Sequence, residues 1–249
     1  METKDWFKNW FNSPYYHLLY SNRNENEAIG FIEKLVQYLK PKPATKLLDV
    51  ACGKGRHSKA LADMGFDVTG IDLSIESILE AKNDESEQLH FYTHDMRLPF
   101  WINYFDIAFN FFTSFGYFKT QREHNNAIRS IAQSLKLNGI LVIDYLNVSY
   151  EENQFEKKTE KNIDDHHFIV TKWHDATHFY KQIQVINNVG ELPINLSTER
   201  VAKFSLNDFK EMLSLQNMQI EEVFGGYDLN KYVEEKSVRM IILARKISY

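Results

Sequence analysis

Residues 47–58 constrain the fold most, because an apolar run containing Asp49 leads through Gly53 and Gly55 into a predicted helix. Glycine adopts positive φ angles and lets a ligand approach the backbone closely. The free N–H groups at the start of the helix face the same turn. A second apolar run ends in Asp72. Two strand ends that each carry an acid predict a site for an adenosine-type cofactor at the edge of an α/β sheet.

The spacing of the small residues does not favour a dinucleotide. The dinucleotide fingerprint G-x-G-x-x-G places a pyrophosphate on the helix start, but Ser58 stands at its third small position. Asp49 would also bring a negative charge towards that pyrophosphate. A cofactor with an ammonium and a sulfonium suits this acid better, so a nicotinamide-dependent oxidoreductase is the least favoured interpretation.

The same stretch resembles motif I of class I S-adenosylmethionine-dependent methyltransferases, roughly D/E-x-G-x-G-x-G. Asp49, Ala51, Gly53 and Gly55 fall on this pattern, with Ala51 in place of the first glycine.

Three further segments resemble the next strands of the family in order. They are residues 66–74, 89–96 and 105–112, and the resemblance covers about residues 30–147 and 205–246. It implies S-adenosyl-L-methionine as cofactor and S-adenosyl-L-homocysteine as product. It also implies that Asp72 binds the ribose hydroxyls, that Asp95 reads the adenine amino group, and that the fourth strand end faces the methyl group.

Residues 13–20 resemble the small-molecule members of the family, in which a Tyr-x-x-x-Tyr element folds over the cofactor. Tyr16 and Tyr20 have that spacing, and Arg23 is a candidate partner for the cofactor carboxylate. His57 would lie near the cofactor on the first turn of its helix. Plain aromatic packing, a surface arginine and a capping histidine stay open as alternatives. The cofactor-binding set expected in total is Asp49, Ala51, Cys52, Gly53, Gly55, His57, Asp72, Leu73, Asp95, Met96, Asn110, Phe111, Tyr16, Tyr20 and Arg23.

Strands that alternate with helices predict the α/β class, with a Rossmann-like, doubly wound sheet of seven strands. The sheet is expected to be mostly parallel with an antiparallel last strand, as the resemblance implies. One helix is predicted from Thr120, which opens a capping box, to about Leu137, with Asn138-Gly139 as its stop.

Beyond Asn147 the pattern changes. Residues 148–166 are polar and predict an exposed loop, and 168–173, 179–187 and 197–204 predict an inserted antiparallel β cap. The expected division is an N-terminal aromatic cap arm (1–24), a cofactor-binding methyltransferase domain (25–147 and 205–249) and the inserted cap (148–204).

The composition of the chain limits the binding partners and the compartment that we expect. The formal net charge of −5 and the lack of a long basic run disfavour nucleic acid. The single cysteine, Cys52, fits a reducing compartment, and no apolar run reaches the length of a membrane span, so a cytoplasmic protein is expected. The histidines of the insertion match no common metal-ligand spacing, so no metal is expected. A homodimer stays open.

We expect methyl transfer to a nitrogen or oxygen atom of a small molecule by in-line displacement, which demands alignment and exclusion of water. An oxygen acceptor would need a base. No catalytic residue is assigned, and His17, Tyr117, Asp144 and Tyr145 are candidates by position only. An RNA or protein methyltransferase and a non-catalytic cofactor-binding subunit are the alternatives. Residues 110–113 begin like the motif of nucleic-acid amino-methylating enzymes but lack its prolines.

Overall fold

The computed structural model describes residues 6–20, 25–153, 158–187 and 193–248. Its first half contains α1 (Trp6–Phe11), α2 (Pro14–Leu19), α3 (Glu25–Leu39), β1 (Lys46–Val50), α4 (Arg56–Asp63), β2 (Asp67–Asp72), α5 (Ile75–Ala81), a 3-10 turn (Lys82–Asp84), β3 (Leu89–Thr93), β4 (Phe105–Asn110) and α6 (Gln121–Ser134). Its second half contains β5 (Leu135–Leu146), α7 (Val148–Asn153), β6 (Lys158–Ile163), β7 (His166–His174), β8 (His178–Asn187), β9 (Pro193–Ala202), α8 (Leu206–Ser214), β10 (Met218–Phe224) and β11 (Arg239–Lys246).

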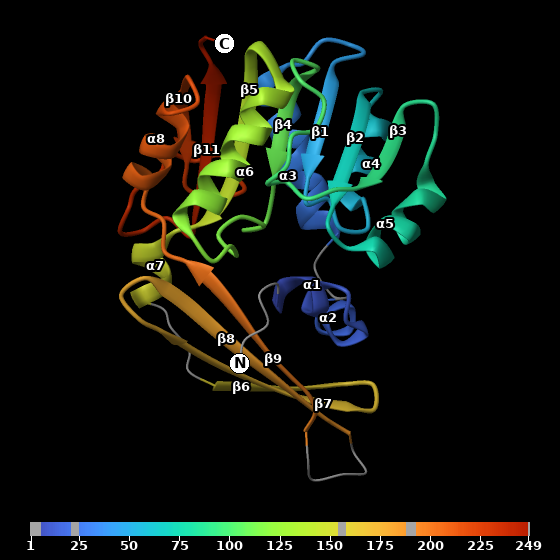
Figure 1. Cartoon of the computed structure of the whole chain (residues 1–249), viewed down its shortest axis with the longest axis vertical. Helices are drawn as coiled ribbons and strands as arrows, with labels where there is room; N and C mark the ends of the chain where they lie inside the picture. Colours follow the sequence, from blue (N-terminus) through green and yellow to red (C-terminus); the bar gives the residue numbers. More distant parts are fainter. Residues whose placement is uncertain (1–5, 21–24, 154–157, 188–192, 249) are drawn as a thin grey trace.

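The strands form two separate sheets (Figure 1). The larger has seven strands in the order β10-β11-β5-β4-β1-β2-β3. β3, β2, β1, β4 and β5 are parallel, whereas β11 pairs antiparallel with β5 and β10 antiparallel with β11. The predicted Rossmann-like sheet is therefore confirmed. The order reverses between β1 and β4, which is where open α/β sheets bind ligands.

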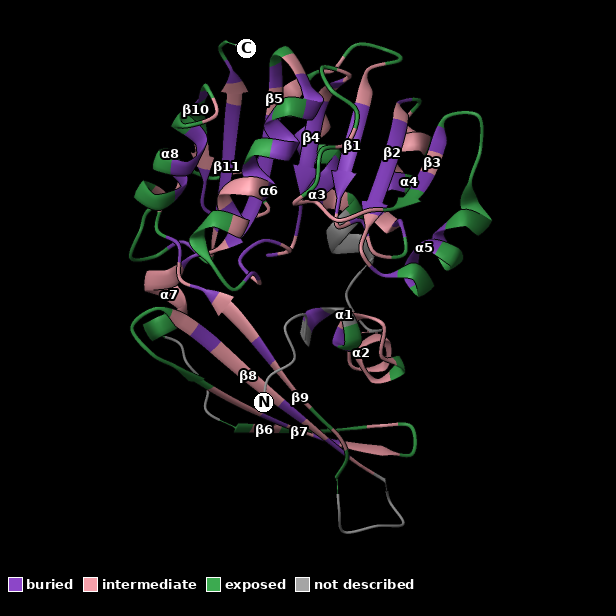
Figure 2. Cartoon of the chain, viewed as in Figure 1, coloured by how far each residue is buried: buried purple, intermediate pink, exposed green. Residues whose placement is uncertain are grey.

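Helices cover both faces of this sheet, and its strands are buried along most of their length (Figure 2). α6 and α8 pack on one face around Ile128, Phe209 and Leu213, which are almost fully buried. α3, α4 and α5 pack on the other face around Ile32, Leu61 and other buried side chains. This core fixes the carboxyl ends of β1, β2 and β4 at one edge.

The second sheet has the order β6-β7-β8-β9 and is antiparallel throughout. Its inner face buries Phe168, Val170, Ile183 and Val185 against Trp10 of the N-terminal arm. The arm, α1 with α2, therefore lies between the inserted sheet and the larger sheet (Figure 1).

The prediction of an exposed loop at residues 148–166 is wrong. α7 and β6 occupy much of this stretch, and β6 pairs with β7 over six residues. Charged side chains such as Glu160 concealed the strand, because an edge strand can carry charge on its solvent face.

The predicted end of the helix near Leu137 is also wrong. α6 ends at Ser134, and Leu135 is extended, fully buried and paired with Phe105. Asn138 takes a positive φ of 65° within the strand rather than stopping the helix. Burial of Leu135 in the sheet outweighs its helix propensity.

His124 on α6 gives the core a pH dependence. Its ring is 3% exposed and lies among the rings of Phe115, Phe118 and Phe204, at centroid distances of 4.9–5.3 Å. Burial lowers the pKa of His124 from 6.5 to about 4. The unfolded chain therefore binds more protons between these two values, and stability at this site is lost as pH falls from 6.5 towards 4.

We predict that His124→Phe makes the free energy of unfolding less sensitive to acid. Between pH 7 and pH 4 the wild type should lose up to about 3 kcal/mol more than the variant, from the shift in the pKa of His124. Urea unfolding of both proteins at several pH values measures this difference. Parallel pH profiles would contradict the assignment.

Candidate functional site

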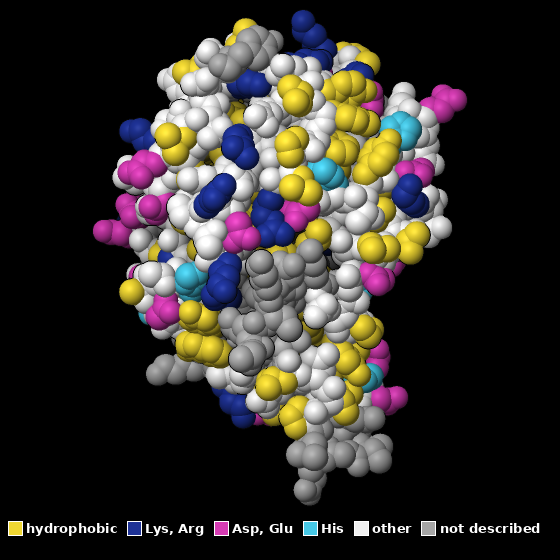
Figure 3. Space-filling view, viewed as in Figure 1, with side chains coloured by type: hydrophobic (Ala, Val, Ile, Leu, Met, Phe, Trp, Pro, Cys, Tyr) yellow, Lys and Arg dark blue, Asp and Glu magenta, His cyan; other side chains and the backbone are white. Residues whose placement is uncertain are grey.

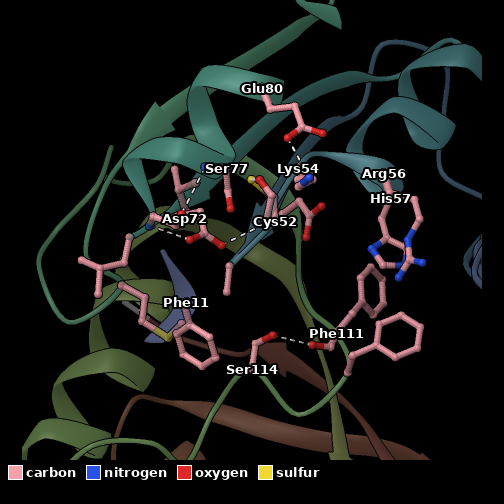
Figure 4. Close-up of a pocket in the computed structure, with 18 of the residues that line it drawn as sticks. Phe11, Cys52, Lys54, Arg56, His57, Asp72, Ser77, Glu80, Phe111 and Ser114 are labelled. Carbon is pink, nitrogen blue, oxygen red and sulfur yellow. Dashed lines mark hydrogen bonds and ion pairs between the residues drawn. The ribbon is translucent and has the colours of Figure 1, made fainter. Parts of the chain in front are cut away.

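A cavity of about 750 Å³ opens at the carboxyl ends of β1, β2 and β4 (Figure 4). The loops after β1, β2, β3 and β4 form one side of it. Side chains of α1 and α2 form the other side, among them Phe11, Tyr16 and Tyr20. The cavity is large enough for a nucleoside cofactor beside a small second ligand.

The loop from β1 to α4 is built from left-handed backbone. Ala51, Gly53 and Gly55 have φ angles of 62°, 56° and 79°. A Cβ on Gly53 would meet nothing within 4 Å, so this glycine faces open space in the cavity. A Cβ on Gly55 would come within 2.6 Å of the ring of Phe91, which is fully buried. Gly55 therefore serves packing, whereas Gly53 leaves room for a ligand.

Asp72 at the end of β2 ties two loops together. One carboxylate oxygen accepts the N–H of Gly53 at 2.8 Å, and the other accepts the N–H of Ser74 at 2.8 Å (Figure 4). Burial raises the pKa of Asp72, and these two N–H groups oppose the rise. Each oxygen keeps a further lone pair for the hydroxyl groups of a ligand.

Asp49 is a buried acid in the cavity wall, 1% exposed. Its carboxylate accepts the hydroxyl of Ser58 at 2.6 Å. Burial raises the pKa of Asp49 to about 6, with a smaller contribution from the charge of Asp72. A buried carboxylate facing a cavity favours a cationic ligand.

Asp95 follows β3 and is bound by Arg97. The guanidinium of Arg97 donates to both oxygens of Asp95, at 2.7–3.1 Å, and also to Glu123 at 2.7 Å. Arg97 lies 4.9 Å from the ring centroid of Phe118 and 5.6 Å from that of Phe7. The wall at the β3 side of the cavity is thus linked to α6 and to the arm.

The loop after β4 is strained and firmly anchored. Phe112 and Thr113 have φ angles of 55° and 57°, which cost about 1–2 kcal/mol each. Asp144 of β5 accepts the N–H of Phe112 at 2.8 Å and the Nε–H of Arg239 at 2.8 Å. Arg239 also donates to the hydroxyl of Thr113. This network fixes the backbone that carries Phe111, Phe112 and Ser114 to the cavity.

Aromatic rings close the β4 side. Phe11 lies 5.1 Å from Tyr16 and 5.3 Å from Tyr117 between ring centroids. His57 stacks on Phe112 at 5.1 Å. In Figure 4 Phe11 and Ser114 lie across the cavity from Lys54 and Glu80.

Most of the predicted cofactor residues line this cavity: Asp49, Ala51, Cys52, Gly53, His57, Asp72, Leu73, Asp95, Met96, Phe111, Tyr16 and Tyr20. Gly55 does not line it, because it packs on Phe91. Asn110 does not line it either, because it is buried and its side-chain amide donates to the carbonyl of Val50. Arg23 lies outside the described residues.

Of the four candidate catalytic residues, two line the cavity and two do not. His17 and Tyr117 line the cavity. Tyr145 is fully buried, lies outside the lining, and donates its hydroxyl to the carbonyl of Ala202. Asp144 is fully buried and occupied by Arg239 and the Phe112 amide, so it acts as an anchor. Among the described residues, no cluster of three acidic, histidine or cysteine side chains is placed to hold a metal.

Sequence reasoning missed the ion pair at the rim. Lys54 and Glu80 lie 2.7 Å apart and join the loop after β1 to α5. It also did not single out Phe7 and Phe11 among the aromatic residues of the arm as lining the cavity. Their spacing of four residues on a helix, which places both on one face, was the available signal.

Comparison with known proteins agrees with this geometry. Residues 48–143 match a family model described as a methyltransferase domain. A solved S-adenosylmethionine-dependent methyltransferase from Clostridium acetobutylicum has a TM-score of 0.76 and 18% identity, over 93% of this chain and 95% of that one. Residues 48–143 therefore form a methyltransferase domain, and the fold of the chain is that of solved S-adenosylmethionine-dependent methyltransferases.

Two curated relatives match shorter stretches. YqeM of Bacillus subtilis is 38% identical over 102 residues, which is 40% of this chain and 41% of the relative. The dTDP-3-amino-3,4,6-trideoxy-alpha-D-glucopyranose N,N-dimethyltransferase of Streptomyces venezuelae is 33% identical over 132 residues, which is 52% of this chain and 54% of the relative. The chain thus spans about half the length of these relatives.

The residues present fit S-adenosylmethionine. Asp72 offers lone pairs beside the open space at Gly53, as a ribose requires, and Leu73, Asp95 and Met96 line the adjoining wall. Asp49 supplies negative charge for a cationic group. The aromatic wall lies beyond the end of β4.

The two glycines of the loop give opposite predictions. Gly55→Ala should lower the free energy of unfolding by about 3 kcal/mol, because its Cβ overlaps Phe91. Gly53→Ala should cost only about 1 kcal/mol of backbone strain, but should weaken binding of S-adenosylmethionine about tenfold by filling the open space. Urea unfolding and calorimetry measure both effects. Equal loss of stability in the two variants would contradict the distinction.

Asp49→Asn should stabilise the free protein while weakening cofactor binding. The carboxyl group stabilises the fold below pH 3.8, and this contribution is lost as pH rises through about 6. The variant should therefore be up to about 3 kcal/mol more stable at pH 8, a gain that shrinks towards zero at pH 4. Its affinity for S-adenosylmethionine should fall about tenfold. A variant less stable than wild type at pH 8 would refute this account.

Proposed function

We propose that this chain transfers the methyl group of S-adenosylmethionine to a nitrogen or oxygen atom of a small molecule by in-line displacement. This proposal rests on the way the arm partly covers the cavity. Phe11, Tyr16 and Tyr20 of the arm cover the edge of the sheet, and the inserted sheet backs the arm. A partly covered cavity of about 750 Å³ suits a small acceptor better than a macromolecule.

S-adenosylmethionine, when bound, supplies an electrophilic methyl group and a neutral thioether as leaving group. The protein's own residues align the acceptor and exclude water, which is most of what such a displacement needs. Asp72 and the Gly53 loop hold the nucleoside. Asp49 balances positive charge, and the anchored loop at Phe111 and Phe112 forms the wall at the methyl end.

An amine is the acceptor that we favour. The rings of Phe11, Tyr16 and Tyr117 lie together at the β4 side, and aromatic faces attract the cation that methylation of an amine produces. The Streptomyces venezuelae relative, named as an amino-sugar N,N-dimethyltransferase, supports the same choice.

An amine acceptor reacts in its neutral form, so alignment matters more than a strong base. For a proton that must leave the site, we propose His17 and Tyr117. Burial lowers the pKa of His17, with a further contribution from the charge of Lys54, so its imidazole is neutral near pH 7. Tyr117 lies beside Phe11 at the acceptor side.

A nucleic-acid substrate is disfavoured. Figure 3 shows basic and acidic side chains interspersed over one face of the molecule, with no continuous basic stripe among the described residues there. The formal net charge of the chain is −5. Phosphate backbones require concentrated positive charge.

We propose that the reaction takes place in the cytoplasm, because the single cysteine of the chain, Cys52, is buried and forms no disulfide within it, as is usual in a reducing compartment. Among the described residues, the structure contains no helix long and apolar enough to cross a bilayer.

The test uses S-adenosylmethionine labelled in its methyl group, with a cell extract separated into metabolite, RNA and protein pools. Label should enter the metabolite pool, and an amino-sugar fraction should compete for it. The matched control is Asp72→Asn, which should transfer nothing. Label confined to RNA or protein would overturn the proposal, and bound cofactor without any transfer would favour a binding subunit.

A further inference from the structure

A single carboxylate of the inserted sheet holds both helices of the arm. Glu199 lies on β9, and its side chain is 10% exposed. Its Oε1 accepts the indole N–H of Trp10 at 2.8 Å and the hydroxyl of Tyr20 at 2.9 Å. Trp10 belongs to α1, and Tyr20 is the C-cap of α2. The carboxylate therefore fixes the arm at two points.

Lys181 of β8 completes this arrangement. Its ammonium lies 3.8 Å from Oε2 of Glu199 and donates to the hydroxyl of Tyr20. Lys181 is the direct cross-strand neighbour of Glu199 in the register of β8 and β9. The charge of the buried carboxylate is thus compensated from within the inserted sheet.

The apolar contacts of the arm do not fix its position in this way. Trp10 packs on Phe168, Val170, Ile183 and Val185, but such contacts are non-directional. Hydrogen bonds to a carboxylate are directional and break when the donors move. Glu199 bonds Tyr20 directly, and it bonds Trp10, whose ring lies 5.7 Å from that of Tyr16 between centroids. Tyr16 and Tyr20 both line the cavity.

We infer that Glu199 is a positioning residue, which clasps the arm over the cavity and thereby limits how fast the cofactor product leaves. The inference rests on the proposed function only in taking the cavity as the cofactor site. Glu199 lies outside the cavity lining and acts through Trp10 and Tyr20. Release of S-adenosylhomocysteine then requires these hydrogen bonds to break.

The experiment measures the dissociation rate of S-adenosylhomocysteine from the full chain by stopped-flow competition. Glu199→Ala removes the acceptor of both hydrogen bonds and should speed dissociation about tenfold. Trp10→Phe removes one donor, keeps a ring in place, and should speed it about threefold. Ser197→Ala is the control, because Ser197 lies on the same strand and its hydroxyl donates to Asn195.

A second readout follows the arm directly. Chymotrypsin should cut within residues 6–20 of Glu199→Ala faster than in wild type or Ser197→Ala, and S-adenosylhomocysteine should protect it less. The unfolding temperature of each protein without ligand shows whether faster cleavage of the arm reflects a loss of stability of the whole fold. If Glu199→Ala does not fold, Trp10→Phe decides the question by the same two readouts.

An unchanged dissociation rate in a folded Glu199→Ala, or an equal rise in Ser197→Ala, would overturn the inference that Glu199 holds the arm over the cavity. These results are independent of methyl transfer. A wild type that binds S-adenosylhomocysteine but methylates nothing refutes the proposed function and leaves the dissociation rates measurable.

Discussion

The carboxylate of Asp72 is the interaction on which the site depends. It receives the N–H of Gly53 from the loop after β1 and the N–H of Ser74 from the start of α5. Because β1 and β2 are parallel neighbours, one side chain can hold both loop ends at the same edge of the sheet. The hydrogen bond from Gly53 to Asp72 fixes the loop that carries Gly53 and adjoins Asp49. Side chains of the arm line the opposite side of the same cavity.

The site also contains backbone strain and a buried charge, both of which lower the stability of the fold. Asp49 remains buried at a cost in stability above pH 6, and Phe112 and Thr113 hold left-handed backbone that their side chains disfavour. The buried Asp144 and the partly buried Arg239 compensate the strain at Phe112 and Thr113, because they fix this loop from neighbouring strands. Such costs are typical of functional sites.

The sequence predicted the local parts of this structure well. The turn at Gly53, the strand end at Asp72 and the capping box at Thr120 follow from short-range rules, and the structure contains all three. It did not predict the roles of Asp144 and Arg239, which lie 95 positions apart and meet only through sheet register. The sequence predicted that Gly55 binds the cofactor. Its contact with Phe91 depends on tertiary packing and could not be seen in the sequence. The strand at β6 was missed because its solvent face is charged.

The most direct test is calorimetric titration of S-adenosylhomocysteine into the wild type and Asp72→Asn, with NADH as comparator. The amide of the variant would direct an N–H group at Gly53 or Ser74, which are themselves donors. We predict binding to the wild type, at least about 50-fold weaker binding to a folded Asp72→Asn, and none of NADH. Binding of NADH in place of S-adenosylhomocysteine, or equal affinity in the variant, would contradict the account.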